Sequence, residues 1–369
     1  MSSSGVLIAG GGLAGACAAF CLSRAGHAVQ LLEAEAPGAG ASGAAAGSVN
    51  PFMARKARPT WRLGEALDAL RWITRAAGAE AVFDETGVLR PARSEKQAGF
   101  FQHTASEHPT RTQWLASGAV AERFPAVQSP HGALWIPDGG AADVPALVEA
   151  LLNAACRNGA AVDSGARVTG WTARAEGVAV DVEREDGVES IEAARLLLCV
   201  GQGFGLLPAL APLALHAVKG QTLRLRRPPA LEGAALPGSL SSNGYVVPQP
   251  GGDGTLLAGS TYEHDFDDLR PTDEGRRYIL GKVSQMLPPL AEAEVVEARA
   301  GARVSPPGSH LPAVGPLPGG DGCHDSRRIW VFTALGSRGL LTAPLLARAL
   351  PSFFDDPARI PDAVRAQAA

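Results

Sequence analysis

Residues 5–35 read GVLIAGGGLAGACAAFCLSRAGHAVQLLEAE, and this stretch decides the fold. The apolar residues 6–9 predict a short buried strand. Small and apolar residues over 13–25 predict a helix, which Gly26 ends. A second apolar run at residues 29–32 predicts another strand, and it closes on Glu33. This order of strand, glycine turn, helix, strand and acidic residue is typical of a parallel α/β domain that binds a dinucleotide.

Gly10, Gly12 and Gly15 form the pattern G-x-G-x-x-G at the turn. In this pattern the first glycine allows a tight turn, the second lets the backbone approach a pyrophosphate, and the third lets the helix pack on the strand. Free N–H groups at the start of the helix attract the phosphates. Glu33 can accept hydrogen bonds from two ribose hydroxyls. The alternative is a glycine-rich turn in an ordinary α/β protein, but the flanking elements favour the dinucleotide site.

Length and composition bound the remaining possibilities. A chain of 369 residues is long for one core, so two domains are expected. Its 46% hydrophobic and 19% charged residues are typical of a globular protein. The net charge of −4 argues against a general electrostatic attraction to nucleic acid, although it leaves room for a local basic patch.

The cysteines predict neither a metal site nor a disulfide framework. Cys17, Cys21, Cys156, Cys199 and Cys323 are odd in number and scattered, and most are expected to be small core residues. The N-terminus lacks the basic start and long apolar core of a signal peptide, and no apolar run reaches about 18 residues. We therefore expect no membrane span and a cytoplasmic location.

Residues 38–51, GAGASGAAAGSVNP, follow the second strand and are almost all small. Ser42 is the first hydroxyl in this stretch. Such a segment suits a second approach of the backbone to a bound cofactor, and the alternative is a flexible surface loop.

Several segments together carry a resemblance that runs nearly end to end. The chain resembles the FAD-dependent amine and amino-acid oxidoreductases of the D-amino acid oxidase and glycine oxidase superfamily. The matching segments are residues 10–35, ASGAAAGSVNP at 41–51, residues 139–171, RLLLCVGQGF at 195–204, GYVVPQPGGDGTLLAGSTYE at 244–263, AGARVSPPGSHLPAVGP at 300–316 and IWVFTALGSRGLLTAP at 329–344.

The resemblance implies an α/β fold in which a Rossmann-like FAD-binding domain is interleaved with a smaller α+β substrate domain built on a mixed or antiparallel sheet. The first would comprise residues 1–84, 144–213 and 301–369, and the second residues 85–143 and 214–300. The implied FAD contacts are Gly10, Gly12, Leu13, Ala14, Gly15, Glu33, Ala34, Ser42, Gly43, Ala46, Gly47, Val168, Gly201, Gly336, Ser337, Arg338, Gly339 and Leu340. No cysteine lies in a recognisable flavin-linking context, so the FAD is expected to be non-covalent.

Two segments near the C-terminus narrow the resemblance to one group within the superfamily. LPAVGPLP at 311–318 and VFTALGSRGLLTAPLLARAL at 331–350 are most similar to the oxidase half of the bifunctional tRNA 5-methylaminomethyl-2-thiouridine biosynthesis proteins. That half removes a carboxymethyl group from a secondary amine on the wobble uridine. From this sequence, which starts at the FAD motif, we expect no methyltransferase half. An oxidase or dehydrogenase of free glycine, sarcosine or D-amino acids therefore stays open, as does an FAD-binding module without turnover.

Three residues are candidates for the substrate site. By the resemblance, Arg303 holds a substrate carboxylate, for which a guanidinium offers two parallel donors. Tyr245 lies where the family often places a tyrosine that contacts the substrate, although a tyrosine packed in the core is an alternative. Arg338 and the backbone N–H groups around it would face the flavin pyrimidine or the substrate at a helix start. Lys219 is expected to be a solvated strand lysine.

A basic segment follows the second FAD segment. Arg55, Lys56, Arg58 and Arg62 fall within about two helical turns and would contact the tRNA backbone near the mouth of the site, or would simply be a solvated face. Oxygen or another acceptor would reoxidise the flavin. We also expect helices over residues 145–157 and 272–286, a less regular stretch over 85–140, and a loose tail from about Asp355.

Overall fold

The opening stretch folds as its sequence predicts in the computed structural model of the protein, which describes residues 5–251, 254–318 and 327–368. It forms β1 (Val6–Ala9), α1 (Leu13–Arg24) and β2 (Val29–Glu33). Gly10 has a φ of 104°, a conformation that side chains other than glycine rarely adopt. A Cβ atom on Gly15 would overlap the carbonyl oxygen of Gly10, so both glycines are needed for the close turn between β1 and α1.

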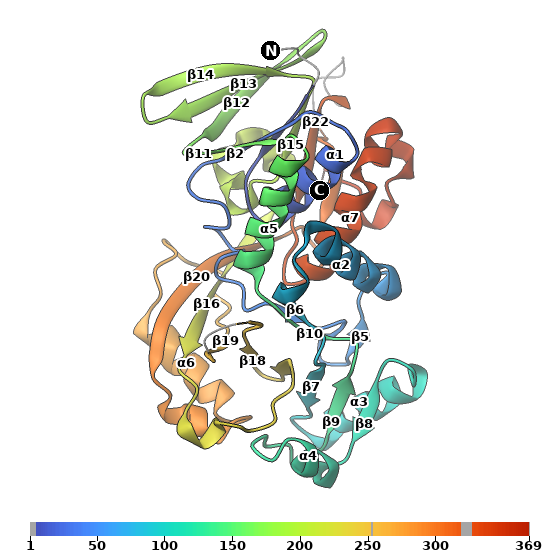
Figure 1. The fold of residues 1–369 in the computed structure, drawn as a ribbon, viewed down its shortest axis with the longest axis vertical. Coiled ribbons are helices and arrows are strands. Elements are labelled where there is room, and N and C mark those ends of the chain that lie inside the picture. The colour runs from blue at the N-terminus through green and yellow to red at the C-terminus, as the bar shows by residue number, and fades with distance from the viewer. Residues whose placement is uncertain (1–4, 252–253, 319–326, 369) are drawn as a thin grey trace.

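These strands lie in a six-stranded sheet in the upper lobe of the molecule (Figure 1). Its order is β11-β2-β1-β15-β22-β21, and every neighbouring pair is parallel except β21 with β22. The remaining strands are β11 (Ala161–Ser164), β15 (Arg195–Leu198), β22 (Ile329–Thr333) and β21 (Ala313–Pro316).

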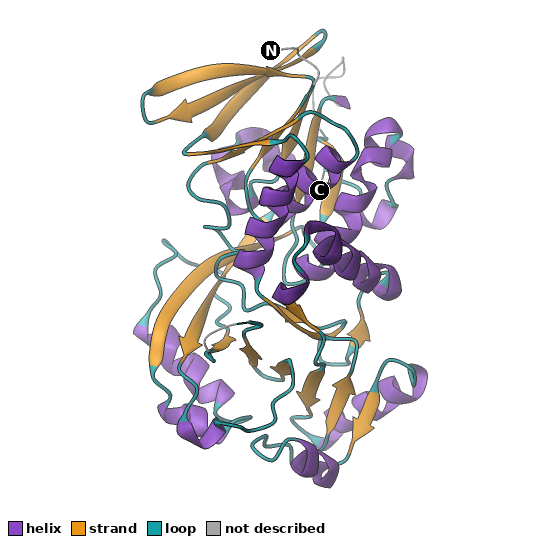
Figure 2. Ribbon diagram, in the orientation of Figure 1, coloured by secondary structure: helices purple, strands orange, loops and turns teal. Residues whose placement is uncertain are grey.

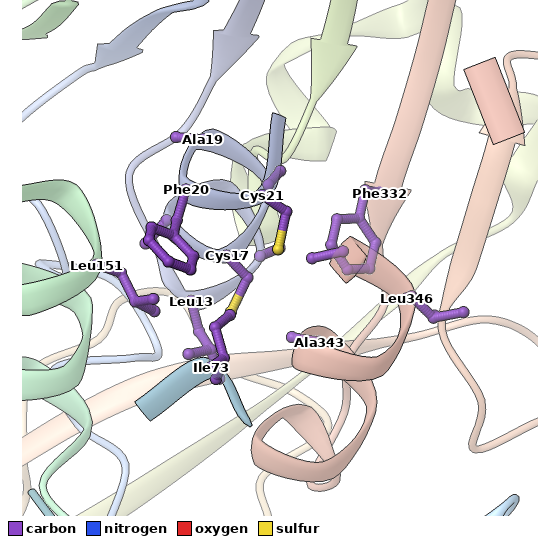
Figure 3. Close-up of a cluster of buried hydrophobic side chains, with 14 of the residues drawn as sticks. Leu13, Cys17, Ala19, Phe20, Cys21, Ile73, Leu151, Phe332, Ala343 and Leu346 are labelled. Atoms are coloured by element: carbon purple, nitrogen blue, oxygen red, sulfur yellow. The ribbon is translucent and has the colours of Figure 1, made fainter. Parts of the chain in front are cut away.

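Helices cover one face of this sheet. Because side chains alternate along a strand, Ile8 and Phe332 point into the helical layer, while Leu7 and Val331 point to the opposite face. Figure 3 shows Phe20 of α1 in the helical core. The helices are α1, α2 (Leu63–Ala77), α5 (Val144–Arg157) and α7 (Gly339–Asp355).

The other face is covered by a second, antiparallel sheet. It has the order β12-β13-β14, with β12 (Arg167–Arg174), β13 (Gly177–Arg184) and β14 (Gly187–Ala193). The short helices η2 (Gly201–Leu206) and η3 (Pro208–Leu213) complete this layer. The upper lobe therefore has three layers: helices, parallel sheet and antiparallel sheet.

An eight-stranded, mostly antiparallel sheet forms the lower lobe (Figure 2). Its order is β20-β16-β19-β18-β17-β7-β9-β8, and only β17 and β7 pair in parallel. The strands are β20 (Val295–Ser305), β16 (His216–Leu225), β19 (Leu256–Gly259), β18 (Tyr245–Pro248), β17 (Ser239–Ser241), β7 (Val88–Pro91), β9 (Ala133–Ile136) and β8 (Gln113–Leu115). The helices of this lobe are α6 (Asp273–Val283), α3 (Glu95–Glu107) and α4 (Ser117–Arg123).

Short strands link the two lobes. One three-stranded sheet contains β3 (Ser48–Val49), β10 (Gly140–Ala142) and β6 (Phe83–Asp84), and β4 (Phe52–Met53) pairs with β5 (Arg58–Pro59). The strand β20 runs across the expected domain boundary at residue 301. We keep the division into residues 1–84, 144–213 and 301–369 on one side and 85–143 and 214–300 on the other as a proposal.

Local sequence signals for the helices are confirmed. The Asp143 carboxylate accepts a hydrogen bond from the Ala146 N–H at 3.0 Å and caps α5. Thr272 caps α6 in the same way, with the Gly275 N–H at 3.1 Å. The predicted helix over 272–286 is shorter in the structure, because α6 ends at Val283.

Three expectations are wrong. The stretch 85–140 is regular, since it carries three strands of the large sheet and two helices. The tail from Asp355 is not loose, because Ile360 and Val364 are buried and the Ala366 N–H donates to the Val314 carbonyl at 3.0 Å. Lys219 is not solvated, as the next section describes.

The cysteines mostly follow their prediction. Cys17, Cys21 and Cys199 are buried and free, and Cys156 is exposed. Burial raises the pKa of the Cys21 thiol to about 12, so this thiol is unreactive at neutral pH. Cys323 lies outside the described residues.

Candidate active site

A cavity of about 280 Å³ lies where the loop at 41–50, the strands of the lower sheet and the start of α7 meet. Tyr262, which lines it, is 60% exposed, so the cavity reaches the surface there. Its other lining residues include Leu13, Ala41, Ser42, Ala44, Ala45, Ala46, Gly47, Asn50, Met53, Gly220, Tyr245, Ser260, Arg303, Gly336, Ser337, Arg338, Gly339 and Leu340.

Arg303 brings a positive charge to this cavity from β20. Its Nη2 donates to the Thr261 carbonyl at 3.0 Å and to the Ser260 hydroxyl at 3.4 Å, and its guanidinium lies 4.3 Å from the centre of the Tyr262 ring. A Cβ atom on Gly220 of β16 would overlap that guanidinium. A glycine at this position therefore makes the space that Arg303 occupies.

Tyr245 lies on β18 beside Arg303 and is partly buried. A Cβ atom on Gly259 of β19 would overlap its phenol, so a second glycine makes room for a second cavity side chain. Burial raises the pKa of the Tyr245 phenol, while the Arg303 charge and a hydrogen bond with Ser260 lower it. The phenol is protonated at neutral pH and can donate a hydrogen bond.

The turn before α7 forms another side of the cavity. The Gly336 N–H donates to the Val304 carbonyl at 3.0 Å, which ties this turn to the strand that carries Arg303. The Arg338 N–H donates to the Leu335 carbonyl at 3.1 Å and is thus used within the turn. The Arg338 side chain lines the cavity, and burial lowers the pKa of its guanidinium.

A second cavity, of about 90 Å³, lies at the carboxyl ends of β1 and β2. Glu33 lines it, and its carboxylate accepts hydrogen bonds from the Gly11 N–H at 2.6 Å and the Glu35 N–H at 3.0 Å. The other lining residues are Ala9, Gly10, Leu32, Ala34, Ala166, Arg167, Val168, Val200, Gly203, Leu206 and Leu207.

The loop at 41–47 lies against the start of α1. The Ser42 hydroxyl accepts a hydrogen bond from the Leu13 N–H at 2.9 Å. The lower sheet holds the loop in place, because Thr222 donates to the Ala44 carbonyl at 3.0 Å and Arg299 donates to the Gly43 carbonyl at 3.1 Å. This loop is therefore anchored, unlike the flexible surface loop that was the alternative interpretation.

Most of the predicted site residues line one of the two cavities. Gly12, Ala14, Gly15, Gly43 and Gly201 line neither. Sequence reasoning missed Gly220, Ser260, Tyr262 and Arg167 as lining residues. Tyr262 carried a signal that could have been used, because it is one of only three tyrosines and lies in the segment 244–263 that carries the resemblance.

Lys219 contacts neither cavity. It is 4% exposed, and its Nζ lies 3.6 Å from a Glu263 carboxylate oxygen and 3.9 Å from one of Asp268. The prediction of a solvated lysine is wrong because the chain after β19 folds back over β16, where Lys219 pairs with Glu263 through the backbone.

The four basic residues are all exposed. They lie in turns, in β5 and just before α2, and not on one helix. Lys56 lies 5.2 Å from the centre of the Phe100 ring, and Arg62 pairs with Glu65 at 3.1 Å. Met53, just before this segment, lines the larger cavity.

The two cavities and the helix start between them fit an FAD molecule. The smaller cavity offers Glu33 for a ribose, the first turn of α1 offers the N–H groups that follow that of Leu13 for a pyrophosphate, and the larger cavity offers small residues and the start of α7 for a flavin ring. When bound, FAD would accept two electrons from the carbon next to a substrate nitrogen.

A metal site and a membrane-spanning helix are both absent from the described residues. In the described ranges, no group of three or more His, Cys, Asp or Glu side chains is placed to hold a metal ion. No helix in the part of the chain that the structure describes is long and apolar enough to cross a bilayer.

Comparison with known proteins decides the family. The model of the DAO family, described as FAD dependent oxidoreductase, matches residues 5–351. The chain belongs to this family. It is an FAD-dependent oxidoreductase, as the cavities and the glycine turn led us to expect.

Relatives in this family carry different activities. The chain is 29% identical over 352 residues to the tRNA 5-methylaminomethyl-2-thiouridine biosynthesis bifunctional protein MnmC of Idiomarina loihiensis, covering 94% of this chain and 54% of that protein. It thus spans about half the length of the bifunctional relatives. It is also 29% identical over 366 residues to a glycine oxidase of Pseudomonas aeruginosa, covering 94% of this chain and 93% of the relative.

A solved structure shares the fold. Iminodiacetate oxidase from Chelativorans sp. BNC1 superposes with a TM-score of 0.79 at 25% identity, covering 98% of this chain and 100% of that one. The mixed α/β fold predicted from the sequence is confirmed.

Proposed function

We propose that this enzyme oxidises the C–N bond of an N-carboxymethyl secondary amine, with 5-carboxymethylaminomethyl-(2-thio)uridine of tRNA as the substrate. The position of Arg303 is the observation that carries the proposal. Its guanidinium lines the cavity and donates hydrogen bonds to Thr261 and Ser260. A guanidinium in this place suits a carboxylate that is bonded directly to the reacting methylene.

The chain's own groups have distinct roles in this proposal. Arg303 binds the carboxylate, and the Tyr245 phenol donates a hydrogen bond to it or to the amine. The start of α7 and Arg338 place positive potential beside the flavin site, which favours electron transfer into it. Removal of two electrons from the substrate would convert the bond between the nitrogen and the methylene of the carboxymethyl group into a C=N bond. Water would then hydrolyse this bond, which releases glyoxylate and leaves a primary amine on the substrate, and oxygen or another acceptor would take up the two electrons.

Two observations support an N-carboxymethyl amine on tRNA as the substrate. The curated relatives include several bifunctional tRNA-modification proteins, and the substrate named for iminodiacetate oxidase is itself an N-carboxymethyl amine. The exposed residues Arg55, Lys56, Arg58 and Arg62 follow Met53 at the cavity wall, where they would contact an RNA backbone.

A second candidate is an oxidase of a free amino acid such as glycine, sarcosine or a D-amino acid. One observation favours it besides the likeness to glycine oxidase. The chain after Tyr262 carries the exposed acidic residues Asp265, Asp267 and Asp268, which would repel a polyanion at that part of the mouth.

Substitution of Arg303 tests the carboxylate site that both candidates share. Arg303→Ala should raise the KM for an N-carboxymethyl amine such as iminodiacetate by about 100-fold, because a charge-assisted bidentate contact is lost. The purified variant should keep its yellow FAD. Loss of FAD, together with an unchanged KM after the variant is reloaded with FAD, would mean that Arg303 serves the cofactor site and not the substrate.

A further inference from the structure

Lys282 is a buried lysine on α6 that the proposed mechanism does not use. Only 8% of it is exposed, and its Nζ donates to the Ser260 carbonyl at 3.4 Å and to the Tyr278 hydroxyl at 3.3 Å. Among the described residues, no carboxylate forms an ion pair with it. The buried Lys219, by contrast, is paired with two carboxylates.

The residues that Lys282 contacts are those that hold Arg303. Ser260, Thr261 and Tyr262 supply a hydroxyl, a carbonyl and an aromatic face to the Arg303 guanidinium. Lys282 reaches the same three-residue segment, since it bonds the Ser260 carbonyl and its Nζ lies 5.9 Å from the centre of the Tyr262 ring. The two cations therefore share one aromatic ring.

Burying an ammonium group without a counter-charge destabilises a protein. A bound anion nearby would offset that cost, because its attraction to the ammonium is weakly screened in a buried site. The cavity beside Arg303 is where such an anion would bind. Lys282 itself does not line the cavity, so it would act through the segment 260–262 and through its field.

We propose that Lys282 is a positioning residue for the substrate carboxylate: it holds the segment 260–262 that orients Arg303, and it adds a second buried positive charge to the anion site. This inference rests on the proposed role of Arg303 in binding a carboxylate. It assigns to α6 a part in substrate recognition.

The test measures binding of a charged and a neutral probe to the FAD-loaded protein, followed by the change in the visible flavin spectrum. The probes are glycolate and glycolamide, which differ in the carboxylate charge. Lys282→Met should weaken glycolate binding about tenfold, as expected for loss of one nearby positive charge from a partly screened anion site. Glycolamide binding should change less than about twofold, and Lys282→Arg should restore most of the affinity for glycolate.

Tyr278→Phe is the matched control, since it removes the hydroxyl that bonds Lys282 but keeps the ring and the ammonium. Its glycolate affinity should stay within about threefold of the parent protein, the range expected for one exposed hydrogen bond. Should Lys282→Met fail to retain FAD, Lys282→Arg carries the test, and a tenfold loss of glycolate affinity in that variant overturns the inference.

The other outcomes are equally distinct. Equal weakening of both probes by Lys282→Met would give Lys282 a purely structural role and overturn the inference, as would no weakening of either. If the parent protein binds glycolate no better than Arg303→Ala does, the carboxylate site fails first, and the inference fails with it.

Discussion

At the scale of single residues, the two side chains that we propose bind the substrate of this oxidoreductase occupy spaces left by glycines. Gly220 lies under the Arg303 guanidinium and Gly259 under the Tyr245 phenol, on two neighbouring strands of the lower sheet. Neither glycine has a positive φ, so a left-handed backbone does not explain them, whereas the space beside each glycine holds a cavity side chain.

The substitution Gly220→Ala tests this arrangement. The added methyl group would overlap the guanidinium, so Arg303 must leave its bonds to Thr261 and Ser260. We expect the KM for iminodiacetate to rise at least about tenfold, with FAD retained, because a hydrogen bond to a charged group contributes about 1.5–3 kcal/mol. Gly99→Ala is the control, since a Cβ atom there meets nothing and activity should not change.

Sequence reasoning reached Arg303, Tyr245 and Arg338 through resemblance to a family, and these three do line one cavity. It did not reach Ser260 or Lys282. Their roles depend on contacts with residues far along the chain, such as the 43-residue separation between Ser260 and Arg303, and no local pattern encodes such contacts.

At the scale of elements, the sequence correctly predicted those turns and helix starts that depend on neighbouring residues. Glycine spacing predicted the turn between β1 and α1, and Asp143 predicted the start of α5. The C-terminal tail was mispredicted because its short helices have weak periodicity, and its order comes from packing on β21.

The tail makes a direct prediction about stability. Ile360 is 1% exposed, and its side chain lies near Gly315 of β21. Ile360→Ala should lower the free energy of unfolding by about 2–5 kcal/mol in urea titrations, as burial of a large aliphatic side chain predicts. Arg359→Ala, a neighbour with an exposed side chain, should change it by less than about 1 kcal/mol. Equal, small effects would mean that the tail is loose after all.

At the scale of the whole molecule, two lobes share one cavity. The upper lobe contributes the start of α7, and the strands β20 and β18 of the eight-stranded sheet contribute Arg303 and Tyr245. The cavity opens at Tyr262, with the basic segment after Met53 near one part of its wall and acidic residues after Tyr262 near another. The overall charge of −4 does not decide between a tRNA and a free amino acid, because these local charges oppose each other.

We propose that an N-carboxymethyl amine on tRNA is the substrate of this enzyme. The most direct measurement mixes the FAD-loaded protein, without oxygen, with tRNA bearing 5-carboxymethylaminomethyl-uridine, and in parallel with iminodiacetate, glycine, sarcosine and D-alanine. Bleaching of the visible flavin band reports substrate oxidation. We predict fast bleaching by the modified tRNA and release of glyoxylate, with slower bleaching by iminodiacetate. Bleaching by glycine, sarcosine or D-alanine, with none by the modified tRNA, would contradict the claim and make this enzyme an oxidase of free amino acids.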